Sequence, residues 1–471
     1  MFKVFRLNQG KYGLSRDVVL LFLFSLLVSL WMAGCGGGEG PESRSPSGQK
    51  EIVITVNNGP LEGDEKRIEE HRLLNELFMK KYPGARIYGD PWQYSPESFM
   101  LRISGGTCTD VVGLFASEAA TIIEKGIPTD ITDMVTEWDK YPYLNKSVLD
   151  PISHEGKIYG LPVGGVGGSY VMTLFYNKDH FREAGIEKPP DTWEEFVEIA
   201  KKLTDRSKGR AGFGILGEKG GAGWHFLNWV WQSGGDFEVK ENGGWKAVFD
   251  SPEAVRALQF LKDLRWKHQV LQDDILCDND DLFEYFSAGR ISMSIFTPEY
   301  LVHLIEKYEM PYQKIGIALL PAGPGGRANQ MGGGYSIINP NISEEKKKWA
   351  FRAITFEYDL DTIELRCQIM KRQGRIFGFG VLPVFSGEYQ DKIEAIIDKY
   401  RTVPGQQELM QEASEYIRPE PPYYCQQLYS EFTGPAVQKV LTDQDADPEE
   451  LLKRAASDFQ ERFLNKVRND Q

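Results

Sequence analysis

The stretch "IVITV" (residues 52–56), with the segment that follows it, decides the fold class. Five uncharged residues with mostly β-branched side chains are typical of a strand covered on both faces. The next segment, "RIEEHRLLNELFMKKYPG" (67–84), predicts a helix that ends at its Pro-Gly pair. Its apolar side chains share one helical face: Leu74, Leu77, Phe78 and Tyr82. "ARIYG" (85–89) and "TDVVGLF" (109–115) predict further strands, so this order indicates a parallel sheet flanked by helices.

A second series of strongly marked helices follows further along the chain. In "PPDTWEEFVEIAKKLTD" (189–205), Thr192 and Glu195 have the spacing of a capping box. In "DSPEAVRALQFLKDLRWKH" (250–268), Ser251 is the expected N-cap and is followed by proline. The last helix, "DPEELLKRAASDFQERF" (447–463), begins with the same kind of signal. We therefore predict an α/β fold with more than one helix–sheet unit.

The N-terminus has the features of an export signal. Residues 18–34 carry no charge and follow four basic residues, which is the order that export machinery recognises. The run ends in Ala33, Gly34 and Cys35, which resembles the bacterial lipobox, where a lipid is attached to the cysteine. A short transmembrane anchor is the alternative, but it would leave Cys35 without a purpose. We expect a signal peptide at 1–34, a flexible Gly/Ser/Pro tether at 35–50, and a lipid-anchored protein on the outer side of the cytoplasmic membrane or in the periplasm.

Charge and length restrict the function further. Loss of residues 1–34 removes four basic residues and one acidic residue, which changes the net charge from −14 to −17. This acidity argues against nucleic acid and anionic lipid as partners. The remaining chain is long enough for two lobes, because single domains rarely exceed about 250 residues. Four cysteines follow the tether: Cys108, Cys277, Cys367 and Cys425. Export makes disulfides possible and four cysteines allow three pairings, but buried free thiols are the simpler interpretation of their scattered positions.

Five ordered blocks of sequence carry a resemblance to a known family. They are "GKIYGLPV" (156–163), "LFYNKDHFREAGIEKPPDTWEEFVEIAKKLTD" (174–205), "FDSPEAVRALQFLKDL" (249–264), "FSAGRISMSIFTPEY" (286–300) and "IALLPAGPGG" (317–326). In order and spacing the chain resembles the extracellular solute-binding proteins of carbohydrate ABC importers, the maltose-binding-protein-like family 1. The chain departs from the family at Thr109, where proline is common, and matches it more loosely from Lys371 to Glu420.

The resemblance implies a two-lobe periplasmic-binding-protein fold, type II-like, with crossover strands as a hinge and a ligand cleft between the lobes. It places the N-lobe at 51–160 with a return at 322–358, and the C-lobe at 161–321 and 359–471. Glycine-rich stretches at 156–168 and 318–326 are hinge candidates from the sequence itself. The implied function is capture of a carbohydrate, most simply an oligosaccharide, by a monomer that delivers it to an ABC permease.

Motifs for catalysis, metals or cofactors give no support to another function. "GFGILG" (212–217) is expected to match a dinucleotide fingerprint by chance, because no acidic residue follows at a suitable position and the glycine-rich "GGAGW" follows in place of an expected helix. "CDNDDLFEYF" (277–286) is acidic without the ligand spacing of a calcium loop, and a solvated turn is expected there. We therefore expect no catalytic residue, no metal and no cofactor. The alternatives that stay open are another solute, such as a glycerophosphodiester or a polyamine, a secreted carbohydrate-active enzyme, and a lipoprotein that only scaffolds partners.

Aromatic residues supply the candidate binding site. The chain has 10 Trp, 21 Tyr and 26 Phe, and such rings stack on the apolar faces of sugars. The resemblance assigns stacking to Trp224, Tyr300, Phe115 and Tyr429, and hydroxyl binding to Asn57 and Asn58. In "GGGY" (332–335), Gly333 would allow close approach of ligand, and Tyr335 follows it. Trp92 joins the candidates because it lies in a proline-flanked loop. Core packing is the alternative for each ring, and Trp229 and Trp231 cannot both face a cleft.

Overall fold

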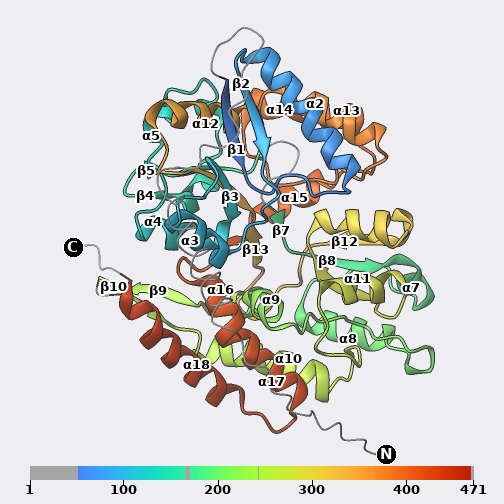
Figure 1. Ribbon diagram of the computed structural model, residues 1–471. Coiled ribbons are helices and arrows are strands. Elements are labelled where there is room, and N and C mark those ends of the chain that lie inside the picture. Colours follow the sequence, from blue (N-terminus) through green and yellow to red (C-terminus); the bar gives the residue numbers. More distant parts are fainter. Residues whose placement is uncertain (1–50, 165–169, 242, 468–471) are drawn as a thin grey trace, which may run out of the picture. The chain divides into compact units, whose positions relative to one another are not determined.

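The computed structural model describes residues 51–164, 170–241 and 243–467, and the predicted signal peptide, tether and Cys35 lie outside them. The first lobe is built on a five-stranded sheet with the order β2-β1-β3-β14-β6 (Figure 1). Its strands are β2 (Ala85–Gly89), β1 (Ile52–Val56), β3 (Val111–Phe115), β14 (Gly334–Ile338) and β6 (Gly160–Pro162). The first three strands are parallel, as predicted, and β14 returns antiparallel between β3 and β6.

Helices cover both faces of the N-lobe sheet. On one face, α2 (Glu65–Lys81) buries Leu74 and Phe78 and contacts β2 and α13, as Figure 1 shows. The other helical segments of this lobe are α3 (Pro96–Ser104), η1 (Ala116–Glu118), α4 (Ala119–Glu124), α5 (Thr132–Thr136), η2 (Tyr141–Tyr143), α6 (Lys146–Leu149), η3 (Asp150–Ile152), α12 (Glu344–Phe356), α13 (Leu360–Arg372) and α14 (Gly387–Tyr400). A small hairpin, β4 (Ser153–His154) and β5 (Lys157–Ile158), completes it.

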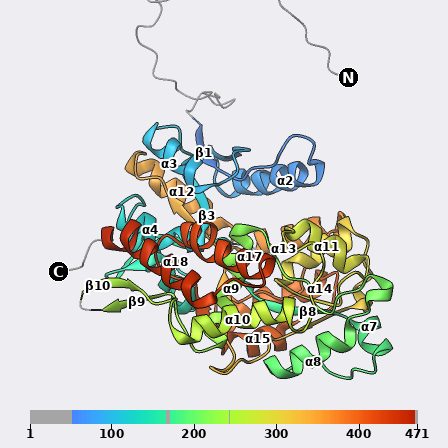
Figure 2. The same cartoon turned by 90° about the horizontal axis from the view of Figure 1, so that it is seen from below.

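The C-lobe combines a three-stranded antiparallel sheet with a large helical layer. Its sheet has the order β11 (Met293–Phe296), β8 (Thr173–Asn177), β12 (Ile315–Ala318), and a separate hairpin joins β9 (Glu238–Glu241) and β10 (Gly244–Ala247). Helices α10, α17 and α18 contact one another and lie close together in both views (Figures 1 and 2). The helical segments are α7 (Lys178–Glu183), α8 (Trp193–Leu203), η4 (Arg206–Lys208), α9 (Lys219–Gln232), α10 (Pro252–Trp266), α11 (Asn279–Ser287), η5 (Pro298–Tyr300), η6 (His303–Lys307), η7 (Tyr312–Lys314), α16 (Cys425–Gln427), η8 (Leu428–Thr433), α17 (Gly434–Thr442), α18 (Pro448–Arg462) and η9 (Leu464–Lys466).

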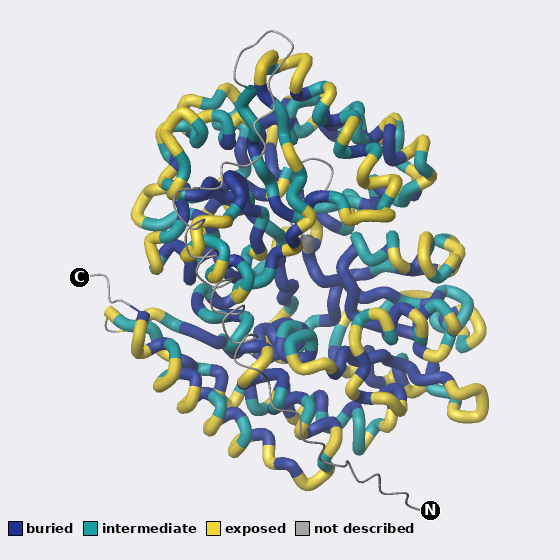
Figure 3. Tube along the Cα trace, viewed as in Figure 1, coloured by how far each residue is buried: buried dark blue, intermediate teal, exposed yellow. Residues whose placement is uncertain are grey.

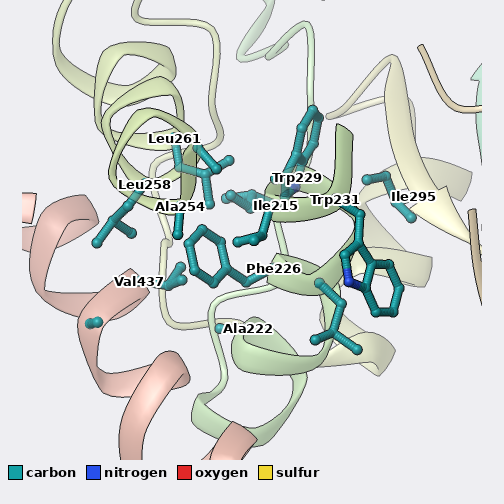
Figure 4. Close-up of a cluster of buried hydrophobic side chains, with 14 of the residues drawn as sticks. Ile215, Ala222, Phe226, Trp229, Trp231, Ala254, Leu258, Leu261, Ile295 and Val437 are labelled. Atoms are coloured by element: carbon teal, nitrogen blue, oxygen red, sulfur yellow. The ribbon is translucent and has the colours of Figure 1, made fainter. Parts of the chain in front are cut away.

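The core of the C-lobe is rich in aromatic rings. Trp229 is 2% exposed and Trp231 is 3% exposed, so neither indole faces a cleft. Figure 4 shows both rings with Phe226 among aliphatic side chains of α10 and α17. The ring of Trp229 meets Trp193 edge to face, with 5.7 Å between the ring centroids. Such pairs add about 0.5–1.5 kcal/mol to the free energy gained by burial.

A third small sheet connects the two lobes. β13 (Asn329–Gly332) pairs antiparallel with β7 (Tyr170–Val171) and parallel with β15 (Ile417–Pro419), and α15 (Gln407–Ser414) packs beside it. Gly333 alone separates β13 from β14, and its φ of 154° is one that glycine tolerates and other residues rarely adopt. The strands of the C-lobe sheet and β13 are almost entirely buried, whereas β1, β2 and β15 are only partly buried (Figure 3).

Helix caps agree with the sequence, and three other expectations differ from the structure. Thr192, Ser251 and Asp447 each accept hydrogen bonds from the first turn of their helices, as predicted. Contrary to expectation, α9 begins at Lys219, so a helix does follow "GFGILG" (212–217). The acidic stretch 277–286 is not a solvated turn, because Asp278 caps α11 and exchanges hydrogen bonds with Asp281. The boundary expected at residue 358 also differs from the structure. Helices α13 and α14 contribute to the same core as β1 and β3. Phe379 and Val403 already pack into a core of C-lobe side chains, and the chain joins the helical core of the C-lobe near Tyr423.

The four described cysteines are free thiols, as expected, and three of them are fully buried. No helix within the described ranges is both long and apolar enough to cross a bilayer.

Two glycines of α9 give a test of how tightly this helix packs. A Cβ atom on Gly223 would lie 2.4 Å from the Tyr429 carbonyl oxygen, whereas one on Gly220 would meet nothing closer than 3.5 Å. We expect Gly223→Ala to lower the free energy of unfolding by about 2–3 kcal/mol, because η8 must move away. Gly220→Ala is the matched control and should leave stability unchanged or raise it by up to about 1 kcal/mol. Urea unfolding measures both, and equal stability of the two variants would contradict the close packing.

Candidate ligand-binding site

A cavity of about 330 Å³ lies where segments of the two lobes meet. Its lining residues come from η1 and β3 of the N-lobe, from Gly333, and from α9, α16 and η8 of the C-lobe. They are Phe115, Ala116, Ser117, Glu218, Gly220, Gly221, Trp224, Gly333, Glu420, Gln426 and Tyr429. The structure thus brings together four of the nine predicted contact residues, which are Phe115, Trp224, Gly333 and Tyr429. Their contact with ligand stays a prediction.

The start of α9 presents Trp224 to this cavity. Glu218 caps the helix by accepting hydrogen bonds from the backbone N–H groups of Gly220 and Gly221. Phe226 and Trp229, two and five residues further along the helix, are buried in the C-lobe core, whereas Trp224 lines the cavity. The indole Nε1–H of Trp224 donates a hydrogen bond of 2.6 Å to Glu420 Oε1, which fixes the ring orientation.

Glu420 is a site residue that the sequence reasoning missed. It follows β15 in the loop "RPEPPYY" (418–424), and its Oε1 accepts a second hydrogen bond, 2.8 Å long, from Gln330 Nε2. Burial raises the pKa of the Glu420 carboxyl to about 7, because removal from water disfavours the charged form more than the two donors stabilise it. A single acid between prolines in a weakly matching segment was the only available sequence signal.

Contacts across the cavity join the two lobes directly. Gln426 Nε2 of α16 donates to Ser117 Oγ of η1 at 3.1 Å, and the backbone N–H of Tyr424 donates to Thr121 Oγ1 at 3.1 Å. Glu118 lies between these two N-lobe partners and is only 6% exposed. Burial raises the pKa of Glu118 to about 7. A change in the separation of the lobes would therefore alter the surroundings of an ionisable group.

The two predicted asparagines serve the N-lobe backbone. Asn57 Oδ1 accepts from the Gly113 N–H at 2.7 Å, and its Nδ2 donates to the Gly113 carbonyl at 3.0 Å. Asn58 has a φ of 54° and accepts the Tyr94 N–H through its side chain. Both line a separate cavity of about 290 Å³ within the N-lobe, together with Arg67 and Arg366. They hold the end of β1 against β3 and Phe115.

Three predicted aromatic contacts do not line the 330 Å³ cavity: Trp92 and Tyr335 are core residues, and Tyr300 is partly buried against a C-lobe core. Trp92 is 9% exposed, donates to Ser98 Oγ and is covered by the Arg102 guanidinium. Tyr300 packs edge to face against Phe283. Tyr335 is 2% exposed and its hydroxyl donates to the Val148 carbonyl at 2.7 Å. The burial of Trp92 and Tyr335 fits the core alternative, and contact of the three rings with ligand stays a prediction.

A larger cavity of about 1000 Å³ adjoins the first one. Ala116 and Glu420 line both, and the Tyr424–Thr121 contact lies beside them. Its other walls come from η3, α14, α15 and the loop after β15, so residues of both lobes line it as well. The predicted contact residues Trp224, Phe115 and Tyr429 face only the smaller cavity.

Comparison with known proteins places this geometry in a family. The family model described as bacterial extracellular solute-binding protein matches residues 65–356, which is more than half of the chain. The chain belongs to this family of bacterial extracellular solute-binding proteins. A binding protein of Brucella abortus (strain 2308) is 25% identical over 71% of this chain and 79% of its own length. The arabinooligosaccharide-binding protein of Halalkalibacterium halodurans is 25% identical over 54% of this chain and 56% of its own.

Solved structures confirm the two-lobe periplasmic-binding-protein fold. The maltose-bound MalE3 of T. maritima superposes with a TM-score of 0.67 and 25% identity, over 87% of this chain and 99% of that chain. The α/β, two-lobe architecture predicted from the sequence is therefore correct. Members of this family are binding proteins, and the family relationship supplies no enzymatic activity.

Glu299 precedes the predicted contact Tyr300, and its carboxyl allows a test of how the stability of this solute-binding protein depends on pH. Its Oε2 is buried and has no hydrogen-bond partner among the described residues, and burial raises the pKa of the carboxyl from 4.5 to about 7. The folded state therefore binds a proton at this carboxyl more tightly than the unfolded chain, so the contribution of Glu299 to stability is complete below pH 4.5 and is lost as the pH rises through 7. We expect Glu299→Gln to reduce the difference in unfolding free energy between pH 5 and pH 8 by about 1–3 kcal/mol.

Urea unfolding at the two pH values measures this effect. Glu345→Gln, which alters an exposed carboxyl on α12, is the control and should leave the difference as in the wild type. A Glu299→Gln variant with the wild-type difference would show that this carboxyl does not titrate between the two pH values.

Proposed function

We propose that this solute-binding protein captures a carbohydrate, most simply an oligosaccharide, in the 330 Å³ cavity and delivers it to an ABC permease. One arrangement carries the proposal: the Trp224 ring, the Glu420 carboxylate and the Tyr429 side chain line the same space. A sugar offers an apolar face to an aromatic ring and hydroxyl groups to a carboxylate. Relatives named for binding arabinooligosaccharide and maltose support this ligand class.

Lobe closure gives the receptor its signal without a covalent step. Ser117 lies on the N-lobe, and Trp224 and Gln426 lie on the C-lobe, so a ligand that touches all three holds the lobes together. Contacts from both lobes exist only in the closed arrangement, and the ligand shifts the equilibrium by the free energy of those contacts. The permease would then distinguish the ligand-bound receptor from the empty one by whether the two lobes are closed.

The charges of the cavity argue against a phosphate-bearing ligand. Among the described residues that line it, Glu218 and Glu420 are acidic and none is Lys, Arg or His. The N-terminus of α9 would be a natural position for a phosphate, but the Glu218 carboxylate already accepts two of its N–H groups. A glycerophosphodiester would therefore meet two carboxylates and no cation. A polyamine would not be repelled, and it belongs in the same binding assay.

Attachment to the membrane completes the proposal. The chain is exported, the signal peptide is removed before Cys35, and a lipid on that cysteine holds a monomeric receptor at the outer face of the cytoplasmic membrane or in the periplasm. The tether at 35–50 gives the binding unit freedom to meet its permease. The lipobox-like end of the uncharged run supports this part.

Ligand titration followed by tryptophan fluorescence tests the receptor role. The chain from Lys50 is titrated with maltotriose, arabinotriose, glycerophosphocholine and spermidine. We expect one of the two sugars to saturate the signal and to be recovered unchanged. Trp224→Ala should weaken its binding at least tenfold, because the ring and the anchor of Glu420 are both lost.

Trp92→Phe is the matched control, since this indole donates to Ser98 within the N-lobe and does not line the cavity. It should bind like the wild type. Saturation by glycerophosphocholine or spermidine alone would replace the carbohydrate with another solute. Cleavage of the sugar would identify an enzyme, and no binding by any compound would favour a scaffold.

Cys35→Ala tests the anchor. The full-length chain produced in a bacterial host should incorporate radiolabelled palmitate and sediment with membranes. The variant should incorporate none and lose the lipid anchor. Unchanged palmitate labelling of Cys35→Ala would rule out this cysteine as the lipid site.

A further inference from the structure

The two oxygens of the Glu420 carboxylate have different surroundings. Oε1 accepts both protein hydrogen bonds, from Trp224 Nε1 and Gln330 Nε2. Oε2 accepts none from the described residues. The Tyr429 hydroxyl is near enough to lower the pKa of the carboxyl, yet it forms no hydrogen bond of normal geometry among the described residues, and the Cys425 thiol lies beside it. One oxygen is thus saturated by the protein, and the other belongs to a side chain that lines the cavity.

This arrangement has the properties of a hydroxyl acceptor. The two donors on Oε1 fix the carboxylate plane, so binding costs little ordering of this side chain. A hydrogen bond from a neutral hydroxyl to a carboxylate is roughly twice as strong as one between neutral groups. The same hydrogen bond ties the acceptor to the Trp224 ring, so a ring stacked on the indole would have its substituents beside Oε2.

We propose that Glu420 is the hydroxyl acceptor of the binding cavity, and that sugar affinity requires its ionised form. This inference rests on the proposed carbohydrate function and adds a contact residue and a pH dependence to it. Glu420 holds Trp224 through Oε1 and the ligand through Oε2, so one carboxylate couples the stacking ring to hydroxyl recognition.

No cation among the described residues of the cavity compensates the charge of Glu420. The titratable groups near it come from η1, β9, the α9 cap, α16, η8 and the walls of the larger cavity: Glu118, Glu238, Glu218, Cys425, Tyr429, Asp150 and His154. Burial raises the pKa of the Glu420 carboxyl to about 7 in the unliganded protein, against the lowering effect of its hydrogen-bond donors. A ligand hydroxyl that donates to the carboxylate stabilises the charged form and lowers the pKa. Affinity is therefore full above pH 7 and decreases as the pH falls through 7.

Glu118 would give the opposite dependence. Its pKa is also raised to about 7, and it lies in the N-lobe segment that meets α16. If closure buries this carboxyl, closure takes up a proton, and binding would strengthen as the pH falls. The two effects have opposite signs and must be separated by substitution.

The experiment measures the dissociation constant of the saturating sugar, maltotriose or arabinotriose, between pH 5.5 and 8.5 in the Glu118→Gln background. We expect affinity to be about tenfold weaker at pH 5.5 than at pH 8.5, because a neutral acceptor replaces a charged one. Glu118→Gln/Glu420→Gln keeps an oxygen for Trp224 but should bind about tenfold more weakly at pH 8.5, with a flat profile. Glu299→Gln added to Glu118→Gln is the control and should keep the pH dependence.

Calorimetry of Glu118→Gln at pH 7 in two buffers with different ionisation enthalpies gives a second readout, which does not depend on folding of the double variant. About half a proton should be released per sugar bound. A flat profile in Glu118→Gln, absence of proton release, or a pH dependence that survives Glu420→Gln would overturn the inference while sugar binding still supported the receptor. Failure of both sugars to bind at every pH would instead overturn the carbohydrate function and this inference with it.

Discussion

The continuous segment 329–338 is the constraint on which the two-lobe structure depends. Its first half is the central strand of the connecting sheet, and its second half is inserted between β3 and β6 of the N-lobe sheet. Only Gly333 separates them, and its carbonyl accepts the Ala116 N–H where the cavity begins. Because both halves are fixed by strand pairing, the freedom of one lobe relative to the other is concentrated in a few connecting residues. Cavity, hinge and core therefore meet at one point of the chain.

Much of the fold could be predicted from local sequence signals. β1, β2 and β3 follow from β-branched runs, and the helices that begin at Trp193, Pro252 and Pro448 follow from their caps. The error at residue 358 has a physical reason. α13 and α14 have ordinary amphipathic patterns, which say that a face is buried but not which core covers it. The acidic run 277–286 was misread because Asp278 and Asp281 exchange hydrogen bonds with each other's backbone, an arrangement that spacing alone did not single out.

The site was harder to predict than the fold. Trp224 and Tyr429 are about two hundred residues apart, and only the close approach of α9 and η8 at Gly223 brings them to one cavity. Tyr335 and Trp92 have the same residue types and similar glycine or proline neighbours, yet they complete N-lobe cores. Composition does not distinguish a ring that binds ligand from one that fills a core, since both are apolar surfaces in need of a partner. No sequence pattern marks Glu420 as a binding residue. Its importance follows from the structure, in which two hydrogen-bond donors converge on its Oε1.

The free thiols have a consequence for an extracellular protein. Burial raises the pKa of Cys108 and Cys277 to about 11 and that of Cys367 to about 12, so these three thiols are almost entirely protonated at neutral pH. Thiolate is the form that attacks disulfides and is oxidised first. The folded state therefore protects its cysteines in an oxidising environment without pairing them. The thiols are unprotected only after the chain emerges from the membrane and before both lobes have folded. The folding rate therefore decides whether incorrect disulfides can form.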